Sequence, residues 1–265
     1  MAEENHGFDR LMDIMRRLRG PGGCPWDAEQ THESLKRYLI EETYEVVEAI
    51  DLNDPGLLKE ELGDLLLQPI FHSAIAEERG EFSMADVIGA ICDKLIRRHP
   101  HVFGNEVITS SDEQVENWDR IKKCEKGDAR KSALAGVPPH MPALMKAQKL
   151  TEKAARVGFD WEHVDQVFAK VLEELHELEE TMVDGDQTRM EAELGDLLFA
   201  IVNLGRFLSL NPEQALGKTI SRFTQRFAFV EEALHVGGRQ MKDATLEEMD
   251  LLWEEAKRKE RESGG

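Results

Sequence analysis

The sequence has little of what marks secreted or membrane-spanning proteins. Its 265 residues contain three cysteines, Cys24, Cys92 and Cys124, which lie far apart and form no Cys-x-x-Cys motif. We therefore expect no disulfide framework and a reducing, cytoplasmic setting. No apolar run approaches the roughly 18 residues of a membrane-spanning helix. The first residues carry neither the basic region nor the apolar core of a signal peptide.

Basic residues are also scarce. The chain has 33 Lys and Arg against 53 Asp and Glu, which gives a formal net charge of -20. Nucleic acids and anionic membranes attract proteins with excess positive charge, so we expect this protein to bind neither nucleic acid nor membrane. Small nucleotides are not excluded, because a bound divalent cation can reverse the sign of one pocket.

The sequence lacks the common motifs for phosphate binding and for nucleophilic catalysis. Neither Gly-x-x-x-x-Gly-Lys-Ser/Thr nor Gly-x-Gly-x-x-Gly is present, and there is no Gly-x-Ser-x-Gly nucleophile elbow. Nucleotide binding therefore could not depend on a Gly-rich phosphate cradle. Any hydrolytic chemistry is expected to depend on a metal ion.

What the sequence does contain is helical periodicity. Apolar residues recur at steps of three and four, as in Phe8, Leu11, Met12, Met15 and Leu18. Alternating strand-like runs are scarce, so the pattern predicts an all-α fold. Asn211 before Pro212 is typical of a helix start, and Thr245-x-x-Glu248 resembles a capping box, which predicts that the last helix begins near Leu246.

The two halves of the chain repeat each other. Glu41-Glu42-x-x-Glu45 recurs 132 residues later as Glu173-Glu174-x-x-Glu177. At the same offset, Glu61-Leu62-Gly63-Asp64 recurs as Glu193-Leu194-Gly195-Asp196. Such self-similarity indicates two copies of one helical module.

The segment between the copies separates the modules. Residues 126–142 are rich in Gly, Ala, Pro and charge and show no long apolar periodicity. We therefore predict an N-terminal module at residues 1–125, a linker at 126–142 and a C-terminal module at 143–265.

Each copy is expected to gather four carboxylates. Residues three apart share one face of a helix, and a short turn makes the two acidic helices of each copy antiparallel neighbours. Packed carboxylates repel one another unless they are protonated or bound to a cation, and oxygen ligands suit Mg²⁺ or Mn²⁺. The predicted metal ligands are Glu42, Glu45, Glu61 and Asp64 in the first copy and Glu174, Glu177, Glu193 and Asp196 in the second.

The alternative interpretation is a solvated acidic face, which is common in a chain with 53 acidic residues. Repetition favours the metal site. Gly63 and Gly195 stand between the acidic residues inside the helices, where Gly costs about 1 kcal/mol relative to Ala. A close approach of another helix would explain these glycines, and we expect one.

A di-iron site is a rival interpretation. Glu173-x-x-His176 matches the ligand spacing of di-iron carboxylate bundles, which require that spacing on two helices. The first copy has Tyr44 at the position of His176. Magnesium is therefore the favoured metal.

Basic and aromatic residues also recur in register. Metal-bound triphosphate still carries charge that Arg or Lys can meet, and a Trp can stack on a nucleobase. The alternatives are ordinary surface ion pairs and core tryptophans. The candidate substrate-binding residues are Lys94, Arg97, Arg98 and Trp118 in the first copy and Lys170, Arg222, Arg226, Trp253 and Lys257 in the second. Trp26 and Trp161, in loops before the acidic helices, could edge the sites or close the ends of the bundles.

These residues together resemble the MazG nucleoside triphosphate pyrophosphohydrolases, and the resemblance covers nearly the whole chain. It rests on both acidic motifs in both halves, on Cys24-Pro25-Trp26-Asp27 with Glu29-Gln30-Thr31-His32, and on the stretch Lys94-Leu95-Ile96-Arg97-Arg98-His99-Pro100-His101-Val102-Phe103. The resemblance implies tandem four-helix modules that pair into homodimers. It also implies Mg²⁺-dependent conversion of (d)NTPs to the monophosphate and pyrophosphate with broad base tolerance.

The resemblance further implies roles for single residues. The four carboxylates of each copy look like Mg²⁺ ligands, and Glu173 and Glu41 are similar to the residue that orients the attacking water. The expected mechanism is in-line attack of this water on the α-phosphorus. Pro69 should kink the acidic helix of the first copy near the carbonyl of Leu65. The second copy is therefore expected to be the stronger catalyst.

Three other functions remain open at this point. One is a housecleaning pyrophosphatase selective for non-canonical nucleotides, and another is a phosphoribosyl-ATP pyrophosphatase. The third is a non-catalytic nucleotide-binding or scaffold bundle, which loss of ligands from both copies would have favoured. Both copies retain every acidic motif residue.

Overall fold

The computed structural model describes residues 7–263 except 107, 111–112, 115–116, 119 and 122–131. Within these residues every regular element is helical, which confirms the all-α prediction. Cys124 and the start of the predicted linker, 126–131, lie outside the described residues. Cys24 and Cys92 are free thiols. The described helices include none that is both long enough and apolar enough to cross a membrane.

The chain divides into two compact units, Met1–Glu125 and Lys126–Gly265. The helices of the first unit are α1 (Phe8–Arg19), α2 (Pro25–Glu29), α3 (Lys36–Asp51), α4 (Pro55–Glu78), α5 (Met84–Arg98) and α6 (Pro100–Phe103). Those of the second are α8 (Ala143–Ala155), α9 (Val164–Asp184), α10 (Gln187–Phe207), α11 (Pro212–Val236), the 3₁₀ helix η2 (Met241–Asp243) and α12 (Leu246–Ser263).

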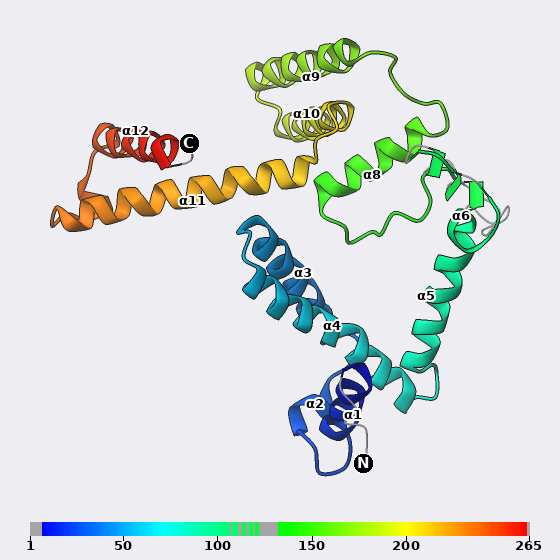
Figure 1. Cartoon of the computed structure of the whole chain (residues 1–265). Helices are drawn as coiled ribbons and strands as arrows, with labels where there is room; N and C mark the ends of the chain where they lie inside the picture. The colour runs from blue at the N-terminus through cyan, green and yellow to red at the C-terminus, as the bar shows by residue number, and fades with distance from the viewer. Residues whose placement is uncertain are drawn as a thin grey trace. The chain divides into compact units, whose positions relative to one another are not determined.

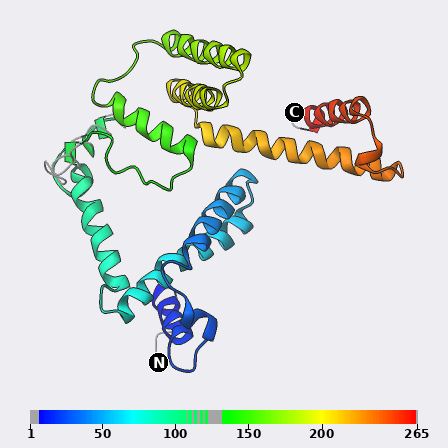
Figure 2. The same cartoon turned by 180° about the vertical axis from the view of Figure 1, so that it is seen from behind.

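A tight antiparallel helix pair organises each unit. In Figure 1 and in the reverse view of Figure 2, α3 lies beside α4, and α9 lies beside α10. Asp54 caps α4 by accepting hydrogen bonds from the backbone N–H groups of Gly56 and Leu57, at 2.8 and 3.1 Å. Asp186, at the equivalent position, caps α10 in the same way. These capped turns reverse the chain, so the acidic helices are antiparallel neighbours as predicted.

The core of the first unit forms where α1 packs on the second half of α4. Met12, Met15, Leu35, Ile70 and Phe71 are among its buried members. Pro69 lies inside α4, yet α4 continues as one helix to Glu78. The helix is thus continuous through Pro69, and the kink expected near Leu65 stays a prediction.

Two predicted helix starts are confirmed. Asn211 accepts a hydrogen bond from the backbone N–H of Gln214 at 3.1 Å and caps α11. The backbone N–H of Thr245 donates to Glu248 at 2.9 Å, the N–H of Glu248 donates to the Thr245 hydroxyl at 3.3 Å, and α12 begins at Leu246. Helix α11 contacts both α8 and α12.

Candidate active site

The second unit brings three of its four predicted ligands together. Glu174 and Glu177 lie one turn apart on α9, and Glu193 faces them from α10. One carboxylate oxygen of each lies within 4.8 Å of the other two. Glu174 is buried, Glu193 is half-buried and Glu177 is exposed. The cluster is thus rooted between the helices and open on one side.

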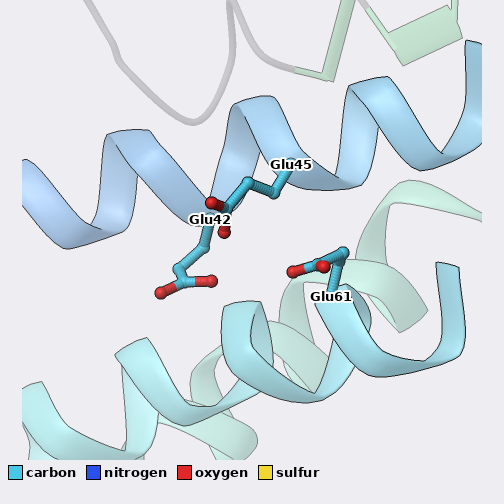
Figure 3. Close-up of side chains that lie close together, drawn as sticks. All are labelled: Glu42, Glu45 and Glu61. Carbon is cyan, nitrogen blue, oxygen red and sulfur yellow. The ribbon is translucent and has the colours of Figure 1, made fainter. Parts of the chain in front are cut away.

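The first unit contains the matching cluster. Glu42 and Glu45 extend from α3 toward Glu61 on α4, as Figure 3 shows. Their oxygens also lie within 4.8 Å of one another, and all three residues are half-buried. Both copies therefore retain a place where one cation could meet three carboxylates.

The two aspartates lie at the edges of the clusters. Asp64 and Asp196 are exposed and fall outside the three-oxygen groups. The charge of Asp64 nevertheless helps to raise the pKa of Glu42 and of Glu61. Asp196 lines a cavity together with Glu174. Each aspartate therefore lies near its cluster without being one of the three carboxylates that meet.

Desolvation and mutual repulsion raise the pKa of carboxyl groups in both clusters. Desolvation, followed by the charges of Glu174 and Glu193, raises the pKa of Glu177. Desolvation and the charge of Glu45 raise the pKa of Glu42. A divalent cation would relieve this repulsion, and an all-carboxylate donor set fits a hard cation such as Mg²⁺ or Mn²⁺. The residues present therefore fit the implied metal.

Lys170 distinguishes the second cluster. Its Nζ lies 2.7 Å from Oε1 of Glu173 and 2.7 Å from Oε1 of Glu174. Hydrogen bonds to these two carboxylates raise the pKa of Lys170, so the ammonium stays charged. Glu173 is exposed beside the cluster, and Glu41 is exposed at the equivalent place on α3. The ammonium of Lys170 thus fixes a positive charge beside the second cluster.

His176 does not join the second cluster. Its ring nitrogens lie 3.8 Å from Glu179 and 3.5 Å from Glu180 on the same helix. The three-carboxylate group on α9 and α10 contains only glutamates. The placement of His176 therefore gives the di-iron interpretation no support.

The other predicted basic and aromatic residues of the second unit lie on α11 and α12. Arg226 pairs with Glu260 at 2.7 Å, and its guanidinium lies 5.8 Å from the ring centroid of Trp253. Arg222 donates to the hydroxyl of Thr219 at 2.9 Å. Lys257 pairs with Glu254 at 2.5 Å. The recorded contacts of these side chains are with one another and their neighbours rather than with the carboxylate cluster.

The first unit makes a similar grouping. The indole N–H of Trp118 donates to the backbone carbonyl of Arg98 at 2.9 Å, and its ring meets His99 edge to face. Lys94 and Arg97 are exposed on α5. Each unit therefore brings its predicted Trp to its predicted Arg, although their positions in the chain are far apart.

The explanation expected for the mid-helix glycines is wrong within this chain. A Cβ atom added at Gly63 or at Gly195 would meet nothing within 4 Å. Helix α3 therefore packs on another side of α4, and α9 on another side of α10. The space at each glycine, beside the carboxylates, stays open. That room is available to a ligand.

Sequence reasoning missed a cavity beside the second cluster. Its volume is about 560 Å³, and its lining includes Phe159, Trp161, Asn203 and Arg206. Trp161, which was expected either to edge the site or to close the end of the bundle, lines this cavity together with Glu174. Asn203 and Arg206 carried no signal in the sequence, because only the packing of α8 and the loop before α9 against α10 creates the space.

These features define a duplicated all-α protein in which each copy holds an acidic site between two antiparallel helices. A family model described as the MazG nucleotide pyrophosphohydrolase domain matches residues 30–103 and again residues 163–229. The chain belongs to this MazG family. The double match agrees with the predicted tandem modules.

Two of the curated relatives match nearly the whole chain. A protein of Thermotoga maritima named nucleoside triphosphate pyrophosphohydrolase/pyrophosphatase MazG is 48% identical over 257 residues, covering 97% of this chain and 98% of that protein. The nucleoside triphosphate pyrophosphohydrolase of Escherichia coli K12 is 46% identical over 257 residues, covering 96% of this chain and 98% of that protein. The crystal structure of a MazG-related protein from Thermotoga maritima is 33% identical, with a TM-score of 0.39, and covers 44% of this chain and 99% of that one.

Proposed function

We propose that this protein hydrolyses nucleoside triphosphates to the monophosphate and pyrophosphate, with broad base specificity and with Mg²⁺ as the metal. The observation that carries the proposal is the cluster of Glu174, Glu177 and Glu193 in a member of this family. We assign Asp196 as the fourth ligand in the second module. Glu42, Glu45, Glu61 and Asp64 are the equivalent ligands in the first.

The residues around the cluster suggest how the reaction is arranged. Mg²⁺ bound there would supply a Lewis acid and make a bound water more acidic. Glu173 is exposed next to the cluster, so its carboxylate could accept the proton of a water that attacks the α-phosphorus. Lys170 already balances Glu173 and Glu174, and the same ammonium could meet a phosphate oxygen once substrate binds.

The exposed apolar faces support a homodimer. Large apolar side chains are exposed along the acidic helices, among them Leu172, Leu175, Leu194, Leu198 and Ile201. Large apolar side chains exposed together on neighbouring helices are typical of an interface. We propose that a second copy of the chain covers it. Association would also let Arg222, Arg226, Trp253 and Lys257 of one copy approach the cluster of the other.

The surroundings of the protein follow from its charge and its thiols. The net charge of -20 supports a protein that binds neither nucleic acid nor anionic membrane. The free thiols of Cys24 and Cys92 are compatible with the cytoplasm, where thiols stay reduced. Both statements are part of the proposal.

The test is a product-resolved assay of the purified protein with ATP and Mg²⁺. We expect AMP and pyrophosphate in equal amounts, and loss of both on chelation of the metal. ADP and orthophosphate as sole products would refute the proposed cut. Binding of nucleotide without turnover would favour the scaffold, and turnover of only altered bases across a substrate panel would favour a housecleaning enzyme.

A further inference from the structure

The cavity of the second unit has the character of a small-molecule site. Its volume of about 560 Å³ lies within the range of ligand pockets, roughly 300–1,000 Å³. Leu150 and Ala154 of α8 and Phe199 of α10 give it apolar walls, and the loop before α9 adds Trp161. Glu174 and Asp196 belong to the same lining. The space is therefore continuous with the carboxylate site.

A chain of hydrogen bonds fixes the polar part of this lining. Arg206 donates to both oxygens of Asp160, at 2.9 and 2.5 Å. Its Nε also donates to Oδ1 of Asn203 at 2.9 Å. Because Arg has no acceptor, Asn203 must turn its oxygen toward Arg206 and its Nδ2 group away. The amide of Asn203, a residue of the lining, is therefore held in one orientation, while Asp160 balances the charge of Arg206.

The first unit has a different side chain at this position. Helices α4 and α10 align without a gap from their caps, Asp54 and Asp186, through their acidic motifs. At the offset of 132 residues, Asn203 corresponds to Phe71. Phe71 is 4% exposed and belongs to the core cluster, and the guanidinium of Arg19 lies 5.3 Å from its ring centroid.

A second position beside the cluster also differs between the two units. At the position of Lys170 the first unit has Tyr38, which packs against the same core cluster as Phe71. Aromatic side chains thus replace both the amide and the ammonium in the first unit, although its three carboxylates remain. The two copies share the acidic cluster and differ in what lies beside it.

We propose that the cavity of the second module is the subsite for the nucleoside part of the substrate, and that Asn203 is a specificity-determining residue that donates a hydrogen bond to the base. This proposal rests on the proposed function and deepens it. If a metal bound by the carboxylates holds the phosphates near Glu174 and Asp196, the attached nucleoside lies next to this space. Trp161 and Phe199 offer aromatic surface for a base. The first module has Phe71 in place of the amide, so it keeps its carboxylates and lacks this donor.

The first test compares ligands with and without a nucleoside. The Asn203→Phe variant reproduces the side chain of the first module. In the presence of Mg²⁺, we expect this variant to bind α,β-methylene-ATP at least about tenfold more weakly than the wild type does. Its Kd for inorganic tripolyphosphate should stay within about twofold of the wild-type value. Phe71→Leu is the matched control and should leave the affinity for both ligands unchanged. Equal loss of both ligands, or loss of neither, on Asn203→Phe would overturn the subsite.

The second test uses a nearly isosteric variant. Asn203→Asp replaces the amide donor by an acceptor while Arg206 can still donate to it. We expect the ratios of kcat/KM for UTP over CTP and for GTP over ATP to fall by at least about fivefold, because the 4-amino group of cytosine and the 6-amino group of adenine gain an acceptor where uracil and guanine have a carbonyl oxygen. Unchanged ratios would overturn the role of Asn203.

The two proposals fail in different ways. If the wild type yields AMP and pyrophosphate but both tests are negative, only the nucleoside subsite is wrong. If the wild type yields no AMP, the proposed function is wrong, while the comparison of methylene-ATP with tripolyphosphate still reports on the subsite by itself.

Discussion

Lys170 lies one helical turn before Glu174 on α9, and its Nζ is 2.7 Å from Oε1 of that carboxylate. The same ammonium holds Glu173 at 2.7 Å. The first module has Tyr38 at the equivalent position, so its cluster lacks this lysine. The two acidic sites are therefore electrostatically different, although every carboxylate of the motif is repeated.

Removing this ammonium should weaken the second site. For Lys170→Met we expect kcat/KM for ATP to fall by at least about tenfold, or about 1.4 kcal/mol of transition-state stabilisation. Mg²⁺ activation should also require a higher pH, because the charge of Lys170 lowers the pKa of Glu177. Steady-state kinetics across pH measures both effects. Tyr38→Phe is the control, and an equal loss in that variant would contradict the assignment.

Removing one carboxylate from each cluster should identify the active module. We expect Glu177→Ala to lower kcat by about 100-fold or more, or about 2.7 kcal/mol, and Glu45→Ala to leave most of the activity. The measurement is the rate of pyrophosphate release at saturating Mg²⁺. If only Glu45→Ala abolished activity, the first module would be the catalyst.

The effect of Mg²⁺ on stability should depend on pH. The pKa values of Glu42, Glu61 and Glu177 are raised in the folded chain by desolvation and neighbouring charge, so the metal-free fold binds protons that the unfolded chain releases. This contribution to stability is present below the ordinary pKa and is lost as pH rises through the raised values. Mg²⁺ bound to the ionised clusters would restore this stability.

We therefore expect the increase in Tm on adding Mg²⁺ to be larger at about pH 7.5 than at about pH 5. Thermal unfolding with and without the metal measures it. The double variant Glu45→Gln and Glu177→Gln should show a smaller increase at both pH values. An increase that is independent of pH would show that Mg²⁺ does not bind these carboxylates.

The mid-helix glycines offer a separate test of the space beside the carboxylates. Since a Cβ at either would meet no atom within 4 Å, Gly63→Ala and Gly195→Ala should each raise the free energy of unfolding by about 1 kcal/mol through helix propensity. Only Gly195→Ala should lower activity, because its methyl group would enter the room next to Glu193 and Asp196. Denaturant unfolding and kinetics on the same samples separate the two effects, and full activity of Gly195→Ala would place the triphosphate elsewhere.

Mixing two inactive variants should reveal whether two copies build one site. If Arg226 of one copy serves the cluster of another, Arg226→Ala and Glu177→Ala should complement each other. Random exchange of subunits would then restore about a quarter of wild-type activity. No recovery, despite exchange shown by mass spectrometry, would place Arg226 and Glu177 in the same subunit's site.

The helices were predictable because their signals are local. The apolar period, the Asn211 cap and the Thr245–Glu248 capping box specify helices through contacts between residues close in sequence. The pairing of α9 with α10 also followed from a short turn. The close approach expected at Gly195 was wrong, because the sequence does not say which side of a helix its neighbour will cover.

The candidate site was predictable in its carboxylates and not in its surroundings. Glu174, Glu177 and Glu193 meet because a helical period and one turn place them together, and these are properties of neighbouring residues. The hydrogen bonds from Arg206 to Asp160 join α10 to a loop 46 residues earlier in the chain. No periodicity specifies a contact of that kind.

The helical fold, the duplication of the acidic module and the retention of its carboxylates in both copies could all be predicted from the sequence. These features reside in repeats and spacings that can be read along one dimension. An inequality of the copies was expected from Pro69, but what lies beside each carboxylate cluster depends on the three-dimensional packing, which leaves a cavity beside Glu174 and buries Phe71 at the position of Asn203. The physical reason is that a cavity is the volume left between packed elements, and it exists only once α8, the loop before α9 and α10 have come together.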